Sequence, residues 1–385
     1  MTNAVTPPIH IVHLLWHFST GGLENGVVNL INQLPADRFV HSIVSLTGHD
    51  AQFAARITTA NVQFYSLNKG PGHDWGTFRR LNTLLKSLRP DVLHSRNLAT
   101  LELQLIGWWR KVPLRLHGEH GWDTSDIGGS NKKNRWLRRL FQPFVQRFIC
   151  LSSESERYLT QIIGIAPSRV ERICNGVQSE KFSSASPVSL PLPGAITVAE
   201  PIIFASVGRL ASVKNQALLL HAFALLLQQQ ADLAARCALV LVGDGPCRTQ
   251  LTQLCEQLQL QNNVLFTGNR DDVAGLMHSF SVFVLPSLAE GISNTLLEAM
   301  AAGTPVIATD VGGNADLLPA PLLQRNLVPS NDSQALMQAM AQYVQQPELL
   351  KTDAVLVKNH CLAHFSLDTM VNSYRKLYEM TRMQT

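Results

Sequence analysis

The sequence predicts an α/β protein of two Rossmann-like domains, each a doubly wound parallel sheet, which face each other across a cleft. The length of 385 residues is enough for two domains of ordinary size. Short apolar runs alternate with helical segments in two successive series, a pattern typical of parallel sheets with helical connections. Between the two series, residues 186–199 are rich in Ser, Pro and small residues without periodicity, which predicts a linker.

The first series occupies residues 1–185 and is expected to form the first domain. Its short apolar runs predict strands at 9–16, 42–46, 62–65, 92–94, 114–117 and 148–151. Helices are expected at 25–34 and 75–88. Gly21 and Gly22 precede the first helix, and glycine there lets the backbone approach a ligand. Arg89-Pro90-Asp91 forms a turn that leads into the strand at 92–94.

The second series, residues 200–367, is expected to form the second domain. Apolar runs predict strands at 201–207, 238–242, 264–267, 281–285 and 306–309, with a helix at 216–229. Two loops that follow strands are rich in glycine, namely Gly208-Arg209-Leu210 and Gly243-Asp244-Gly245-Pro246. A last helix is expected at about 368–382.

Composition is that of a folded globular protein, with 45% hydrophobic and 16% charged residues. No apolar run is long enough to span a membrane. The N-terminus has no basic segment ahead of an apolar core, so we expect no signal peptide and a cytoplasmic protein. The six cysteines have no metal-binding or disulfide spacing and are interpreted as reduced, mostly buried thiols.

Charge is distributed unevenly along the chain. Residues 1–182 hold 21 Lys and Arg against 13 Asp and Glu, and residues 183–385 hold 11 against 15, so the two parts carry +8 and −4. Much of the excess lies at 132–147, where cations alternate with aromatic and aliphatic residues at near-helical spacing and no acid occurs. This pattern fits an amphipathic helix on anionic headgroups, with the protein peripheral on the inner face of the membrane. A solvated helix whose apolar side faces the core fits equally well. The patch is too short to predict nucleic-acid binding.

The segment 286–313 carries the most specific pattern. Pro286 ends an apolar strand, Ser293 or Asn294 can cap the helix that follows, and Gly303 suits the end of that helix. Glu290 and Glu298, with seven residues between them, flank a helix N-terminus that is suited to an anion. Taken alone, Glu298 is also an ordinary acid near a helix start.

This segment resembles the E-x7-E donor-site motif of family 4, or group 1, glycosyltransferases, which have the GT-B architecture. The resemblance extends in order over nearly the whole chain, including Asn175-Gly176-Val177 before the linker. It implies that the last helix packs back on the first domain. It also implies that Glu298 binds ribose hydroxyls and that Glu290 holds sugar hydroxyls near the reacting carbon. The implied donor-binding residues are Gly21, Gly22, Gly208, Gly243, Gly291, Ile292, Ser293, Asn294, Thr295 and Glu298.

Two cations follow the first strand of the second domain. Arg209 offers a fork and Lys214 a point charge to phosphate, and both match the G-R-L-x-x-x-K element of the family, which neutralises the nucleotide diphosphate. Such neutralisation would take the place of a divalent metal. We therefore expect no metal and no cofactor.

Histidines follow strands of the first domain. His117-Gly118-Glu119-His120 contains two His, but no third ligand stands at a convincing spacing for zinc. The resemblance implies an active-site His here, either His117 or His120, with His120 favoured. The string from His117 to Asp123 is similar to that of sugar transferases associated with exopolysaccharide and exosortase systems.

The expected function is that of a retaining, metal-independent glycosyltransferase. The resemblance implies transfer from a UDP- or GDP-linked sugar to a hydroxyl of a lipid-linked or polysaccharide acceptor. Glu290, His117 or His120, Arg209 and Lys214 would carry the chemistry, with the cations acting electrostatically. A nucleotide-sugar epimerase of the same fold and a non-catalytic nucleotide-sugar-binding protein are the alternatives.

Overall fold

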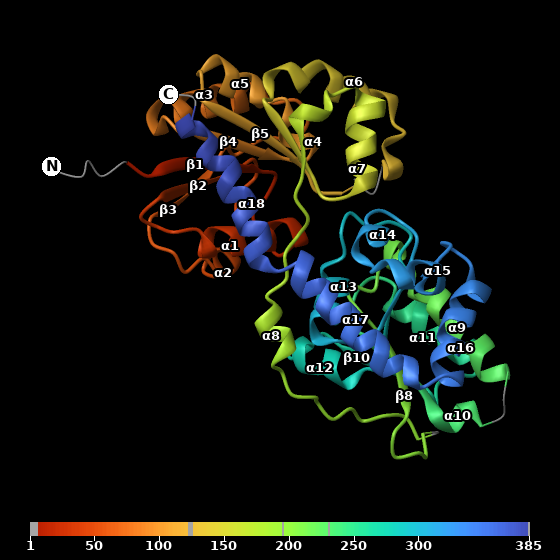
Figure 1. The fold of residues 1–385 in the computed structure, drawn as a ribbon. Coiled ribbons are helices and arrows are strands. Elements are labelled where there is room, and N and C mark those ends of the chain that lie inside the picture. The colour runs from red at the N-terminus through yellow and green to blue at the C-terminus, as the bar shows by residue number, and fades with distance from the viewer. Residues whose placement is uncertain (1–6, 122–125, 195, 230–231, 384–385) are drawn as a thin grey trace. The chain divides into compact units, whose positions relative to one another are not determined.

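The computed structural model describes residues 7–121, 126–194, 196–229 and 232–383 and divides the chain into two compact units (Figure 1). Unit 1 comprises Met1–Gly176 and Leu367–Thr385, and unit 2 comprises Val177–Ser366. The first boundary therefore lies nine residues before the expected 185. The segment from Val177 onward packs on unit 2, where the Ser279 hydroxyl donates to the Val188 carbonyl over 2.7 Å. Most of the segment expected as a linker is thus part of unit 2.

Unit 1 is a seven-stranded parallel sheet with the strand order β3-β2-β1-β4-β5-β6-β7. Its strands are β1 (Ile9–Leu15), β2 (Phe39–Ser45), β3 (Val62–Ser66), β4 (Val92–Arg96), β5 (Leu114–Glu119), β6 (Arg147–Cys150) and β7 (Val170–Arg172). Its helices are α1 (Gly22–Gln33), α2 (Ala51–Ala54), α3 (Trp75–Leu88), α4 (Leu98–Leu101), α5 (Gln104–Trp109), α6 (Lys132–Phe141), α7 (Ser153–Arg157) and α18 (Leu367–Glu379).

Unit 2 is a six-stranded parallel sheet with the strand order β10-β9-β8-β11-β12-β13. Its strands are β8 (Ile202–Val207), β9 (Cys237–Val242), β10 (Val264–Gly268), β11 (Val282–Leu285), β12 (Val306–Thr309) and β13 (Leu327–Val328). Its helices are α8 (Ser179–Ser183), α9 (Gln216–Gln229), α10 (Leu233–Arg236), α11 (Arg248–Gln257), α12 (Val273–Ser279), α13 (Asn294–Ala302), α14 (Asn314–Leu317), α15 (Leu323–Asn326), α16 (Ser333–Gln345) and α17 (Glu348–His364).

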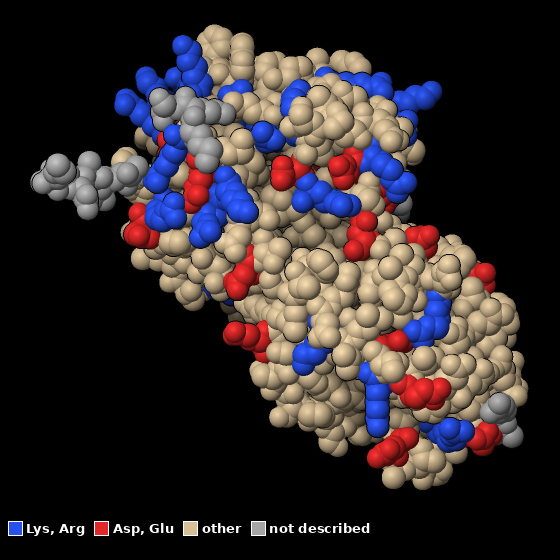
Figure 2. Space-filling view, viewed as in Figure 1, with Lys and Arg blue, Asp and Glu red and all other residues tan. Residues whose placement is uncertain are grey.

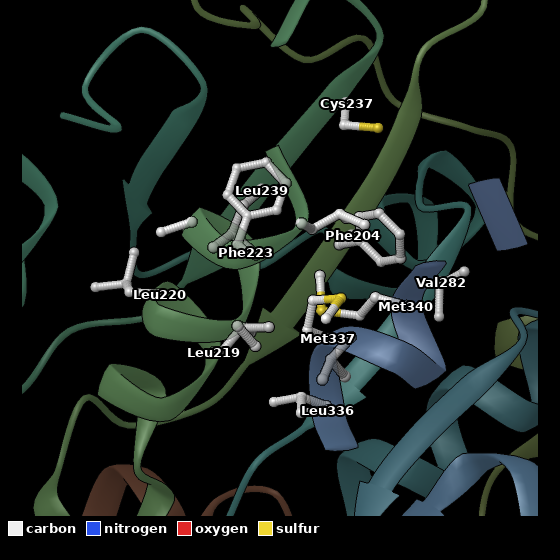
Figure 3. Close-up of a cluster of buried hydrophobic side chains, with 14 of the residues drawn as sticks. Phe204, Leu219, Leu220, Phe223, Cys237, Leu239, Val282, Leu336, Met337 and Met340 are labelled. Carbon is white, nitrogen blue, oxygen red and sulfur yellow. The ribbon is translucent and has the colours of Figure 1, made fainter. Parts of the chain in front are cut away.

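Each sheet is covered by helices whose apolar residues meet those of the strands. In unit 2, Phe204 and Leu239 from adjacent strands pack with Phe223 of α9 and Met340 of α16 (Figure 3). In unit 1, Tyr374 and Tyr378 of α18 join the cluster that includes Ile11 and Leu116. Full burial of one large apolar side chain is worth about 1.5–3 kcal/mol, so these clusters hold the helices on the sheets. Helix α18 is thereby fixed on unit 1, although unit 2 separates it from the rest of that unit in sequence.

Both strand orders reverse direction at one internal position. In unit 1 the chain winds outward one way from β1 and the other way from β4, and these two strands are hydrogen-bonded neighbours. In unit 2 the same relation joins β8 and β11. Loops that leave the carboxyl ends of such a strand pair diverge, which leaves room for a ligand between them. The reversal points are therefore where a ligand site is expected in each unit.

The predicted strands are present, and so are the helices predicted at 25–34, 75–88, 216–229 and 368–382. The helices α16 and α17 were not predicted. The edge strands β7 and β13, of three and two residues, were not predicted. Both are too short to show periodicity, and pairing with a neighbouring strand defines them. Four of the six cysteines are buried, as the sequence predicts. No helix in the described ranges has the length and apolar character needed to cross a bilayer.

Candidate active site

The reversal point of unit 2 joins the two loops that the sequence singled out. One loop follows β8 and contains Arg209 and Lys214, and the other follows β11 and contains Glu290. The Leu288 amide of the second loop donates to the Val213 carbonyl of the first over 2.8 Å. This hydrogen bond joins two loops that lie more than 70 residues apart in sequence but next to each other at the carboxyl edge of the sheet.

Lys214 and Glu290 form an ion pair in this loop pair. The Lys214 Nζ atom lies 2.6 Å from Glu290 Oε1, and the Ser287 hydroxyl donates to the same oxygen over 2.6 Å. Glu290 is nearly buried, whereas Lys214 keeps 28% of its side chain exposed. Arg209 is exposed, and no hydrogen bond or ion pair of its guanidinium is found in the described structure. One cation is therefore paired and one is open to solvent.

A glycine turn after β12 packs against the backbone of the Glu290 loop. Gly312 has φ +58°, and a Cβ atom there would lie 1.9 Å from the Glu290 carbonyl oxygen. The Gly313 amide donates to the Gly291 carbonyl over 3.0 Å, and the Thr309 hydroxyl donates to the Ser287 carbonyl over 2.6 Å. Only glycine fits position 312, because both the φ angle and the close approach exclude a side chain.

A second close approach fixes the loop after β9. Gly243 has φ +126°, and a Cβ atom there would lie 2.1 Å from the Gly208 carbonyl oxygen. Gly245, with φ +159°, would in the same way place a Cβ atom 2.4 Å from the Leu210 carbonyl oxygen. The backbones of Gly208 and Gly243, both predicted as donor-binding residues, are thus in close contact. The Gly243–Pro246 loop packs against the loop that contains Arg209.

Helix α13 starts at this edge and carries Glu298. Ser293 is the N-cap, and its hydroxyl accepts from the Leu296 amide over 3.3 Å. The first turn of the helix, with its positive dipole end, therefore follows directly on Glu290, Gly291 and Ile292. Burial raises the pKa of the Glu298 carboxyl to about 7, and Lys181 of α8 opposes this rise. Glu298 is thus an acid whose charge is sensitive to pH near neutrality.

The two candidate histidines of unit 1 differ in burial and in surroundings. His117 is fully buried within β5, where its Nδ1 atom lies 2.8 Å from the Ser95 hydroxyl. His120 follows the end of β5 and lines a small pocket together with Arg96, Asn175 and Tyr374. Burial, then the Arg96 charge, lower the pKa of His120 to about 3, so its imidazole is neutral. Of the two, only His120 lines a pocket, so it is the one we favour as the active-site histidine.

Arg96 is a site residue that the sequence analysis missed. It lies at the end of β4 with only 3% of its surface exposed, and its guanidinium contacts His13 Nδ1 at 3.1 Å and His94 Nδ1 at 3.2 Å. Burial, then Arg96, hold the pKa values of both histidines well below the ordinary value. A cation two residues after the predicted strand that ends at His94 was the available signal. Its neighbours in space come from β1, from its own strand β4 and from α18.

The acid between the histidines anchors α6. Both guanidinium contacts of Arg138 to the Glu119 carboxylate are short, at 2.7 and 3.0 Å. Burial alone would raise the pKa of Glu119, but Arg138 holds it below its usual range. Helix α6 is therefore attached to the strand end that presents His120.

Gly21 and Gly22 lie at the N-terminus of α1, after β1. Gly21 is the N-cap, and its carbonyl accepts from the Asn25 amide over 2.9 Å. A Cβ atom on Gly21 would lie 2.2 Å from a carboxylate oxygen of Glu24, which folds back over the turn. Burial raises the pKa of Glu24, while Arg96 and His17 lower it. Glu24 was not singled out from the sequence.

In the part of the chain that the structure describes, no three His, Cys, Asp or Glu side chains gather as a metal-binding group would. Asp123, which ends the string beginning at His117, lies outside the described residues. The sequence interpretation that leaves zinc aside stays a prediction.

Comparison with known families matches both halves of the chain. Residues 20–181 match the family described as Glycosyltransferase Family 4, and residues 196–359 match the family described as Glycosyl transferases group 1. Together the two matches cover most of the chain, in the order that the sequence analysis expected.

Individual relatives show the same likeness. EpsF of Bacillus subtilis (strain 168) is 28% identical over 308 residues, which are 78% of this chain and 79% of that protein. UDP-Gal:alpha-D-GlcNAc-diphosphoundecaprenol alpha-1,3-galactosyltransferase of Escherichia coli is 26% identical over 307 residues, 77% of each chain. The crystal structure of Anabaena HepE in complex with UDP superposes with a TM-score of 0.78 at 18% identity, over 97% of this chain and all of that one. The structural likeness confirms the predicted GT-B fold.

Proposed function

We propose a donor, a mechanism and an acceptor class for this chain, which belongs to the group 1 glycosyltransferases and has the GT-B fold. The donor is a nucleotide-diphospho-sugar, UDP- or GDP-linked, held by unit 2. The acceptor is a hydroxyl of a lipid-linked saccharide or polysaccharide, for which unit 1 supplies the recognition surface.

The observation that carries the donor proposal is the Lys214–Glu290 pair beside the start of α13. A diphosphate leaving group develops charge as its bond to the sugar breaks, and fixed positive groups stabilise that charge. Arg209, Lys214 and the amides at the start of α13 supply it at the reversal point of the sheet. Glu290 then holds sugar hydroxyls, and Glu298 holds the ribose. This set of cations neutralises the diphosphate without a divalent metal.

The proposed reaction retains the configuration of the transferred sugar. The acceptor hydroxyl attacks the face of the sugar from which the diphosphate departs, and its proton passes to the leaving phosphate. No acidic residue of the chain forms a covalent bond in this scheme. His120, neutral and at the end of β5, would take part through a hydrogen bond rather than accept the proton.

Helix α6 supports an acceptor at a membrane surface. Trp136 and Leu140, one helical turn apart, are 59% and 46% exposed, although Phe141 of the same helix packs on the core. Lys132, Lys133 and Arg139 are exposed along the same helix. Lys and Arg side chains gather over the part of unit 1 that includes α6 (Figure 2). This combination favours contact of 132–147 with anionic headgroups over the alternative of a solvated helix with all its apolar residues inside.

The relatives support the choice of substrates. The name of the Escherichia coli enzyme specifies a UDP-sugar donor and a diphosphoundecaprenol-linked acceptor. The HepE structure contains UDP. We therefore expect UDP to be the preferred nucleotide.

A donor screen tests the proposal. UDP-sugars should raise the unfolding temperature, GDP-sugars should do so less, and 5 mM EDTA should not remove the effect. With a diphosphoundecaprenol-linked saccharide as acceptor, product NMR should show the anomeric configuration of the donor. Nucleotide release that does not depend on acceptor, with an epimerised sugar, would identify the epimerase alternative. Binding without any turnover would identify the non-catalytic one.

A further inference from the structure

A pocket of about 360 Å³ lies in unit 1, at the edge of its sheet opposite the edge that carries Arg96 and His120. Its walls are the end of α3 with the turn into β4, and the end of α5 with the turn into β5. Both turns lead to the amino-terminal ends of strands, whereas the active-site residues follow carboxyl-terminal ends. We call this pocket the basic pocket and define it by Lys86, Arg89, Asp91, Arg110 and Lys111.

The charges of the basic pocket are unbalanced. Four cations face one carboxylate, Asp91, which already accepts from the His10 amide over 2.8 Å. None of the four cations has an ion-pair partner in the described structure, whereas Arg38, Arg80 and Arg138 of the same unit all have one. Arg110 donates from Nε to the Asn82 side chain over 2.6 Å, which leaves its two terminal nitrogens for another acceptor. Like charges held this close repel unless an anion joins them.

The backbone holds two of these cations in an unfavourable conformation. Among the described residues other than glycine, eight have positive φ: five are Asn, one is Gln, and the other two are Arg89 at +44° and Lys111 at +55°. Asn tolerates this region, but Arg and Lys gain nothing from it. Arg89 also precedes Pro90, a position where helical backbone angles are disfavoured. Both strained cations line the same pocket, and unfavourable backbone of this kind gathers at functional sites.

We propose that the basic pocket binds a phosphate-bearing ligand. The guanidinium forks of Arg89 and Arg110 match pairs of phosphate oxygens, and Lys86 and Lys111 add point charges. Trp109, which directly precedes Arg110, is 68% exposed and offers apolar surface next to the pocket. Figure 2 shows Lys and Arg side chains gathered over the region of α3 and α5. The phosphate belongs to a soluble ligand or to a phospholipid headgroup, and the two sources are separable by experiment.

The experiment uses the full chain with Arg209→Ala and Lys214→Ala, which remove the cations of the candidate donor site so that they cannot bind the probe. The test pair, Arg89→Gly with Lys111→Gly, removes two pocket cations and relieves the backbone, because glycine adopts positive φ readily. The control pair, Arg79→Gln with Lys376→Gln, removes the same charge from exposed helix positions of unit 1 outside the pocket. Calorimetric titration with pyrophosphate at constant ionic strength measures the soluble source. Cosedimentation with phosphatidylcholine vesicles, with and without phosphatidylglycerol, measures the headgroup source.

We expect the test pair to have an unfolding temperature equal to or above that of its background, so loss of binding is not loss of folding. For a soluble ligand, one pyrophosphate binds per chain, and the test pair weakens it by at least about tenfold while the control pair does not. For a headgroup, the test pair binds the phosphatidylglycerol vesicles more weakly than its background does, with only the contribution of α6 left, and the control pair keeps the binding of the background. The proposal is overturned if test and control pairs behave alike in both arms, or if the glycine pair lowers the unfolding temperature.

Discussion

The carboxyl edges of the two sheets differ in the burial and the partners of their cations. In unit 2, Lys214 is partly exposed and pairs with Glu290, and Arg209 is open to solvent. In unit 1, Arg96 is buried and contacts the neutral imidazoles of His13 and His94. A partly exposed pair can exchange its carboxylate for a ligand at little cost, whereas a buried cation among imidazoles depends on its surroundings staying uncharged.

The difference indicates separate tasks for the two edges. The unit 2 edge is suited to bind and release a strongly charged group such as a diphosphate. The unit 1 edge is suited to hold neutral histidines in fixed positions beside a pocket. Disrupting each edge should therefore produce different defects, and the following predictions proceed from the largest expected effect to the smallest.

The largest effect is expected from Lys214→Ala. Loss of one preorganised positive group at a developing anion costs about 10²–10³-fold in turnover. Glu290→Gln should also lower turnover, and the two losses should not add, because the side chains share a hydrogen bond in the resting protein. Steady-state release of nucleotide in the presence of acceptor measures both. Full activity of the Lys214→Ala enzyme would show that the cation of this loop is not used.

We expect position 312, in the turn that packs against the Glu290 loop, not to tolerate a side chain. Gly312→Ala combines a positive φ with a Cβ atom 1.9 Å from a carbonyl oxygen, so we expect a loss of at least about 2 kcal/mol in unfolding free energy. Gly268→Ala is the matched control, because Gly268 has φ +71° but no atom within 4 Å of its Cβ position. The control should lose only about 1 kcal/mol. Equal losses in chemical denaturation would remove the close approach as the cause.

The two edges should respond to pH in opposite directions. The pKa of Glu298 is raised to about 7 in the folded chain, so its contribution to stability is full below about 4.5 and is lost as pH rises to 7. The pKa of His120 is lowered to about 3, so its contribution is present above about 6.5 and is lost as pH falls toward 3. Glu298→Gln should therefore raise the unfolding temperature at pH 8 and leave it nearly unchanged at pH 5. Similar shifts at both pH values would contradict the assignment to Glu298.

The smallest effect concerns the imidazole beside Arg96. Arg96→Met keeps an unbranched side chain and removes its charge, so the pKa of His120 should rise. It should stay below 6.5, because burial is the larger cause of its depression. NMR titration of the His120 ring measures the change. An unaltered His120 pKa in a folded variant would mean that the guanidinium does not act on this ring.

Local pattern was sufficient for much of the fold. The apolar runs identified the central strands, and Ser293 and Gly303 marked the ends of α13 as expected. Strand pairing could not be predicted from the sequence, because the two residues of β13 form a strand only by pairing with β12. The first domain boundary was predicted at 185 but lies after Gly176. The segment that follows is rich in Ser and Pro and therefore resembles a linker in sequence, yet it packs on unit 2 through Val188.

For the candidate site, the sequence by itself determined the residue types and their order: glycines after strands, two cations after β8, and two glutamates around a helix start. These follow from local rules of turns, caps and charge. Only the tertiary structure decided which residues meet. It paired Lys214 with Glu290, packed Gly312 against that loop, buried His117 while leaving His120 at a pocket, and placed Arg96 against His13 of a different strand. The physical reason is that burial and pairing depend on neighbours distant in sequence, which the sheet brings together at its edge.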